Sequence, residues 1–152
     1  MMRLLLTLIV VATFVLPAKA QIASNNAVYG RDGITALLAK SLNQNFNVTN
    51  TDTAVTVSVT KYLVRRVTVT NCSTSFGVSL ATVGVFTGAG GTGTTVVALG
   101  TLTTLTGATK YVDLTLALTT DTLTAATLYF RNGVTFGSAA TCDIYLFGDV
   151  LP

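Results

Sequence analysis

The sequence predicts an all-β protein, a single antiparallel β-sandwich of jelly-roll-like type with about seven or eight short strands. Three observations predict it. From Ala54 onward the chain consists of short Thr/Val/Leu alternations, which place one set of side chains on each face of a strand. Thr and Val are β-branched residues that suit a pleated surface. Glycine-containing turn signals separate the runs at regular intervals.

Residues 1–20 form a separate, signal-like apolar segment. Arg3 supplies a positive start, and Leu4–Leu16 is an apolar run of the length found in export signals. The run is too short for a spanning helix, which needs about twenty apolar residues. Ala18-Lys19-Ala20 fits a cleavage site, with Gln21 as the first mature residue. An uncleaved anchor, or an apolar arm retained in an assembly, remains an alternative.

Residues 21–53 have a different composition, rich in Asn, and are expected to form an N-terminal arm. Ile34, Leu37 and Leu38 recur at helical spacing, with an acidic residue before them and a basic residue near the end. The pattern predicts a short helix over residues 33–41. The alternative is an extended arm that packs on a neighbouring subunit.

Residues 54–152 form the predicted sandwich domain. Val112, Leu114, Leu116 and Leu118 alternate with more polar residues, the clearest one-sided strand pattern in the chain. Gly88–Gly93 is expected to be a flexible turn between two strands. The predicted strands are 55–60, 62–70, 78–86, 95–102, 112–118, 128–131 and 142–147.

The composition removes most catalytic options, because the chain has no His, no Glu and no Trp. Without imidazole, general acid–base chemistry and metal binding have few carriers. The glycine turn lacks the Lys-Ser/Thr ending of a phosphate loop. The carboxylates Asp113, Asp121, Asp143 and Asp149 show no paired spacing. We therefore predict no catalytic, cofactor-binding or metal-binding residue, and no enzyme activity.

Charge is scarce, since only 10% of residues are charged and the net charge is +3. Two of the positive charges, Arg3 and Lys19, belong to the N-terminal segment. Arg65 and Arg66 are adjacent and are expected on opposite strand faces, so they predict no nucleic-acid-binding patch. A Thr-rich surface is easier to desolvate than a charged one. The composition favours a subunit of an assembly or an extracellular protein, with a monomer of threonine-rich surface as the alternative.

The two cysteines, Cys72 and Cys142, are candidates for a disulfide. In an exported protein they could be bridged, which would stabilise the fold by roughly 4 kcal/mol in the chain-entropy model. In a reducing cytosol both would be small buried hydrophobic residues. The sequence leaves these two states open.

The strand pattern of residues 61–151 resembles small virion proteins of tailed bacteriophages. The residues that carry the likeness are 63–71, the glycine turn at 88–93, 120–130 and 143–151. The resemblance implies a β-sandwich accessory subunit of decoration or cement type, located on the virion surface and homo-oligomeric. Its partners would be other virion proteins or copies of itself, without nucleic acid, membrane or cofactor. The signal-like segment departs from this pattern, because tailed-phage capsids assemble in the cytosol.

The alternative function is an exported surface, fibre or carbohydrate-binding β-sandwich protein, secreted after cleavage at Ala20. Sugar sites usually use exposed aromatic residues, and the candidates here are Tyr29, Tyr111 and Tyr145.

Overall fold

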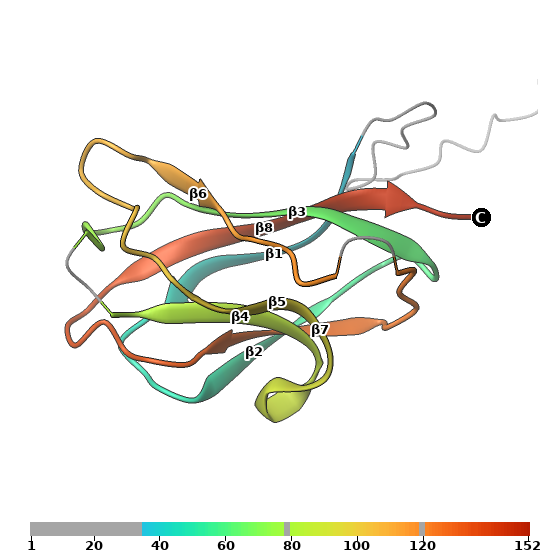
Figure 1. Ribbon diagram of the computed structural model, residues 1–152, viewed down its shortest axis with the longest axis horizontal. Helices are drawn as coiled ribbons and strands as arrows, with labels where there is room; N and C mark the ends of the chain where they lie inside the picture. The colour runs from blue at the N-terminus through green and yellow to red at the C-terminus, as the bar shows by residue number, and fades with distance from the viewer. Residues whose placement is uncertain (1–34, 78–79, 119–120) are drawn as a thin grey trace, which may run out of the picture.

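The computed structural model describes residues 35–77, 80–118 and 121–152. Two four-stranded antiparallel sheets pack face to face (Figure 1). The signal-like segment 1–20, Tyr29 and the first part of the predicted arm lie outside the described residues. Among those described, no helix has the length and apolar character needed to cross a membrane. The strands are β1 (Ala36–Asn45), β2 (Thr51–Thr56), β3 (Tyr62–Thr70), β4 (Thr82–Gly88), β5 (Thr92–Thr101), β6 (Tyr111–Asp113), β7 (Thr127–Asn132) and β8 (Thr141–Val150), with a 3-10 turn, η1 (Ala89–Gly91), between β4 and β5.

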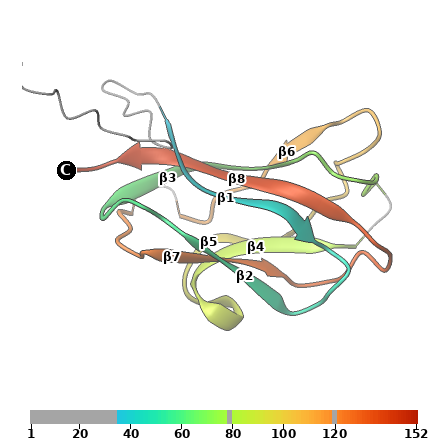
Figure 2. The ribbon, with the colours of Figure 1, turned by 180° about the vertical axis from the view of Figure 1, so that it is seen from behind.

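The strand order is that of a jelly roll, so the predicted fold class is confirmed. Sheet A has the order β1-β8-β3-β6, and sheet B has the order β2-β7-β4-β5. The pairs β1·β8, β2·β7, β3·β6 and β4·β5 are nested, as in one long hairpin whose turn lies at η1. Rolling this hairpin also brings β8 beside β3 and β7 beside β4. Figures 1 and 2 show the two layers from opposite sides.

The core lies between the two sheets and is built from the alternating apolar residues of their strands. In β3, Val64, Val67 and Val69 are buried, whereas the residues between them face outward. Two residues separate Val64 from Val67 because a register shift lies between them. In β7, Leu128 and Phe130 are fully buried. Alternation in the sequence therefore becomes burial on one face of each sheet.

The predicted helix at residues 33–41 is wrong for the part of it that the structure describes. Residues 36–45 form β1, a ten-residue edge strand of sheet A that pairs with β8. Register shifts between Leu37 and Ala39, and between Ser41 and Gln44, interrupt the two-residue period of this strand. Because β1 and β2 are strands of the two sheets, the sandwich includes residues before Ala54, where the sequence placed its boundary.

The segment 112–118 has the predicted burial pattern but is not one continuous strand. Only Tyr111–Asp113 pairs as β6. The chain then crosses between the layers: the amide of Leu114 donates to Val67 O on sheet A (2.8 Å), and the amide of Ala117 donates to Val96 O on sheet B (2.9 Å). This crossing segment closes one side of the sandwich and covers part of the edge of β5.

Candidate functional site

A disulfide links the neighbouring strands β3 and β8 of sheet A at one end of the sandwich. The Sγ atoms of Cys72 and Cys142 are 2.09 Å apart, and the two residues have a sequence separation of 70. Cys142 is fully buried at the start of β8, and Cys72 follows β3. Two hydrogen bonds flank the bridge: Ser73 N donates to Thr141 O (2.8 Å), and Thr141 N donates to Ser73 Oγ (3.0 Å). Of the two states that the sequence left open, the structure contains the bridged one.

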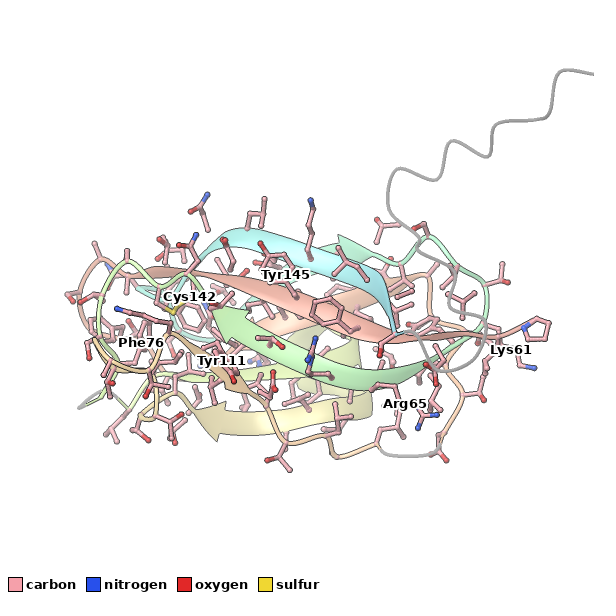
Figure 3. All side chains as sticks on the ribbon, turned by 90° about the horizontal axis from the view of Figure 1, so that it is seen from above. Lys61, Arg65, Phe76, Tyr111, Cys142 and Tyr145 are labelled. Atoms are coloured by element: carbon pink, nitrogen blue, oxygen red, sulfur yellow. A yellow bond between two sulfur atoms is a disulfide. The ribbon has the colours of Figure 1, made fainter. Side chains whose placement is uncertain are left out.

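A groove of about 520 Å³ lies beside this disulfide, within the range of small-molecule sites. Hydroxyl groups dominate its lining, and its one charged side chain is Lys110. Tyr111, which is 60% exposed, stands next to it and pairs with Thr70 across the strands (Figure 3). The lining residues are Thr70, Asn71, Cys72, Ser73, Thr74, Ser75, Leu105, Thr106, Gly107, Thr109 and Lys110. No sequence pattern predicts this groove, because its two walls come from segments more than twenty residues apart.

The outer face of sheet A carries aromatic and cationic side chains (Figure 3). The rings of Tyr145 and Phe147 are stacked, with centroids 6.3 Å apart. The Arg66 guanidinium lies 4.6 Å from the Phe147 centroid, a cation–π contact. Arg65 Nε contacts Asp149 Oδ2 at 2.7 Å.

The prediction that Arg65 and Arg66 point to opposite faces is wrong. A register shift between Val64 and Arg66 inserts an extra residue into β3, so both arginines are exposed on the outer face of sheet A. Each still has a structural partner, and Lys61 is an exposed neighbour in the sequence.

The aspartates on this sheet act as ties between strands and loops. Asp143 accepts hydrogen bonds from Asn43 N and from Asn71 Nδ2, both at 2.9 Å. Both asparagines have positive φ, near 50°, where Asn is tolerated better than most residues. Thr68 Oγ1 donates to Asp113 Oδ1 at 2.5 Å. The Asn-rich composition thus supplies left-handed turn positions and hydrogen-bond partners.

On the outer face of sheet B, the glycine hairpin is hydrogen-bonded to Asp52, which also forms an ion pair with Arg131. Asp52 Oδ1 lies 3.0 Å from Arg131 Nη1, and its Oδ2 accepts the Gly90 amide at 2.5 Å. Gly90 and Gly91 have φ of +74° and +76°, which only glycine adopts readily. The turn that the sequence suggested to be flexible is therefore attached to β2 and β7, and it curls away below sheet B in Figure 1.

The most strongly perturbed titratable group belongs to the core. Burial raises the pKa of Tyr62 to about 12, because the phenolate would lose its hydration. Its hydroxyl donates to Ala125 O at 2.8 Å. In the described part of the chain, no three His, Cys, Asp or Glu residues are grouped to hold a metal ion. Tyr62 is therefore a packing residue with a satisfied polar end.

Comparison with protein-family models, curated proteins and solved structures found no match to this chain. Of the aromatic residues singled out from the sequence, Tyr111 and Tyr145 both face outward from sheet A.

Proposed function

We propose that the protein is a non-enzymatic structural subunit that acts through protein–protein contacts, as an accessory or decoration subunit on a virion surface. Its partners would be other virion proteins or further copies of this chain. Jelly rolls occur in viral capsid domains and also in lectin domains, so the fold is compatible with this role without deciding it.

The observation that carries the proposal is that the aspartate side chains of the sandwich are engaged in bonds within the fold. Asp52, Asp113, Asp143 and Asp149 each bond a neighbouring strand or loop. These bonds stabilise the sandwich, and the strands of sheet B contain no charge other than the Asp52–Arg131 ion pair, so their outer surface is nearly uncharged. Such surface is inexpensive to desolvate against another protein. The resemblance of residues 61–151 to small virion proteins supports the same role.

Quantitative mass spectrometry of gradient-purified virions tests the proposal. The chain should be present in many copies per particle and should stay at a constant ratio to the main shell protein across the particle peak. A chain that separates from the particle peak, or stays at the level of contaminating host proteins, would contradict a virion role.

The disulfide favours a second candidate function, an exported surface or fibre protein that binds carbohydrate. Disulfides form and persist mainly in oxidising compartments. The hydroxyl-lined groove offers hydrogen bonds for a sugar, and the exposed Tyr111, which pairs with the lining residue Thr70, offers an aromatic surface. This candidate predicts mature protein in the medium with Gln21 at its N-terminus, in cultures free of phage.

Glycan-array binding would separate the sugar-binding form of this candidate from the first proposal. Tyr111→Ala should abolish binding to any saccharide on the array that the wild-type protein binds. Tyr129→Ala, on sheet B, is the control and should leave binding unchanged. If the wild-type protein binds no saccharide on the array, the sugar-binding candidate is excluded.

A further inference from the structure

Two hydrogen bonds tie together the two walls of the groove beside the disulfide. The walls are the segment after β3 and the segment before β6. Thr70 Oγ1 donates to Lys110 O at 2.9 Å, and Phe76 N donates to Leu105 O at 2.7 Å. The disulfide joins the first wall to β8. These links hold the walls in place, so a ligand would not have to order them.

Hydroxyl groups of both walls can donate hydrogen bonds to a ligand. Thr106 Oγ1 accepts from the amides of Ala108 and Thr109, at 3.2 and 3.0 Å. On the other wall, Ser73 Oγ accepts from Thr141 N at 3.0 Å. A hydroxyl has one donor and two acceptor positions, so a hydroxyl that accepts an amide keeps its own hydrogen for another acceptor. The groove therefore offers donors to the oxygens of a ligand.

The charge of the groove is a single cation. Lys110 is the one charged residue among the described residues that line it. Its ammonium group donates to Gly107 O, and two of the three ammonium hydrogens remain for a ligand. The neighbouring carboxylates, Asp143 and Asp113, are outside this lining and accept hydrogen bonds from side chains of the fold. The groove therefore favours a ligand that carries one negative charge.

The same lining argues against other classes of ligand. An apolar ligand would find little to pack on, because Leu105, the one large apolar residue of the lining, is only 2% exposed. A divalent cation would meet no carboxylate among the described lining residues. A polyanion such as a nucleic acid is held by several cations, whereas this lining supplies one. These properties together indicate a small polar molecule with many hydrogen-bonding groups and one acid group.

We infer that the groove binds an acidic saccharide, a sugar that carries a carboxylate or sulfate group. Lys110 pairs with the acid group, and the hydroxyls of Ser73 and Thr106 donate to the sugar oxygens. The ring of Tyr111, which is 60% exposed and pairs with the lining residue Thr70, offers an apolar face for a sugar ring. This inference rests on the second candidate function, carbohydrate binding, and specifies the class of sugar.

A glycan array that pairs neutral oligosaccharides with their uronic-acid and sulfated counterparts tests the class of sugar. The wild-type protein should bind acidic members at least about tenfold more tightly than the neutral ones, because hydrogen bonds to charged groups are stronger. Carboxylate and sulfate members are scored separately, so the array also identifies the acid group. Equal binding of neutral and acidic members would overturn the inference and leave the carbohydrate-binding candidate in place. A protein that binds no member would exclude both.

Lys110→Ala and its matched control Lys61→Ala test whether the groove supplies the charge. Both lysines are exposed, and Lys61 lies at the opposite end of the sandwich from Cys142 and Tyr111 (Figure 3). Lys110→Ala should weaken binding of the tightest acidic glycan by at least about tenfold, whereas Lys61→Ala should change it by less than about twofold. Equal weakening by both variants would show that binding follows the net charge of the protein, and would overturn the inference.

Salt dependence separates a lost charge from a disturbed loop, since Lys110→Ala also removes the bond to Gly107 O. Rising ionic strength should weaken binding of the acidic glycan to the wild type, and should have much less effect on Lys110→Ala. Circular dichroism should show both lysine variants folded. If the folded Lys110→Ala variant keeps the salt dependence of the wild type, Lys110 does not pair with the acid group, and the inference is refuted.

Discussion

Breaking the disulfide should cost the protein a large part of its stability. The bridge closes a segment with a sequence separation of 70. In the chain-entropy model a closed loop of this size restricts the unfolded chain by ~4 kcal/mol. A single domain has about 5–15 kcal/mol in total, so the reduced protein should remain folded but marginal. For a domain of this size the loss corresponds to a fall in melting temperature of roughly 15 °C.

Urea unfolding of the oxidised and the reduced wild type measures the effect without changing any side chain. The double variant Cys72→Ala/Cys142→Ala should lose slightly more, because it also leaves space at the fully buried Cys142. The mechanism acts on the unfolded state, so the dependence of stability on urea should become steeper in both broken forms.

A loss below about 1 kcal/mol on reduction, with an unchanged urea dependence, would refute the loop-closure reasoning. It would mean that the unfolded chain between the cysteines is already restricted by residual structure. Thiol counting before and after reduction is the control, since the oxidised protein must show no free thiol.

Three further changes test local features. Gly148→Ala should destabilise the fold by about 1–3 kcal/mol, because its Cβ would clash with the Leu63 carbonyl oxygen, whereas Gly107→Ala, which has open space, should change the urea midpoint little. Asp52→Ala should speed hydrogen exchange of the η1 amides, because it removes both the Gly90 bond and the ion pair; unchanged exchange would show that the anchor is dispensable. The pKa of Tyr62 is raised by burial from 10.0 to about 12, so its contribution to stability is complete below pH 10 and is lost as the pH rises towards 12. Ultraviolet titration of the folded protein should find tyrosine ionisation continuing well above pH 10, and its absence would contradict the burial argument.

The fold class could be predicted because short runs of β-branched and apolar residues are separated by turn signals. The predicted and observed bounds of β3 are the same, although a register shift interrupts its alternation, whereas the burial in β7 alternates strictly. β1 could not be predicted, because two register shifts change which residues face inward. Its buried residues, such as Ala36, Ala39 and Ser41, therefore recur at spacings that resemble a helix.

The surfaces were less predictable than the fold, because they depend on residues that are distant in the sequence. The groove beside the disulfide joins the segment after β3 to the segment before β6, and no local pattern marks it. A register shift also explains why the adjacent residues Arg65 and Arg66 lie on one face, whereas a regular strand would place them on opposite faces. The cysteine pair was visible in the sequence, but its bridged state depends on how β3 and β8 are paired.

The nested strand pairing has a consequence for the order of events during synthesis. β8 lies between β1 and β3, and its Asp143 contacts Asn43 across 100 residues of chain. Only the β4–β5 hairpin is local, so it is the natural starting point from which the remaining pairs zip outward. Until residues 141–150 have left the ribosome, β1 has no neighbour in its sheet and sheet A cannot close. Closure of sheet A thus waits for β8, and until β8 is in place the incomplete sandwich has open strand edges, which favour aggregation.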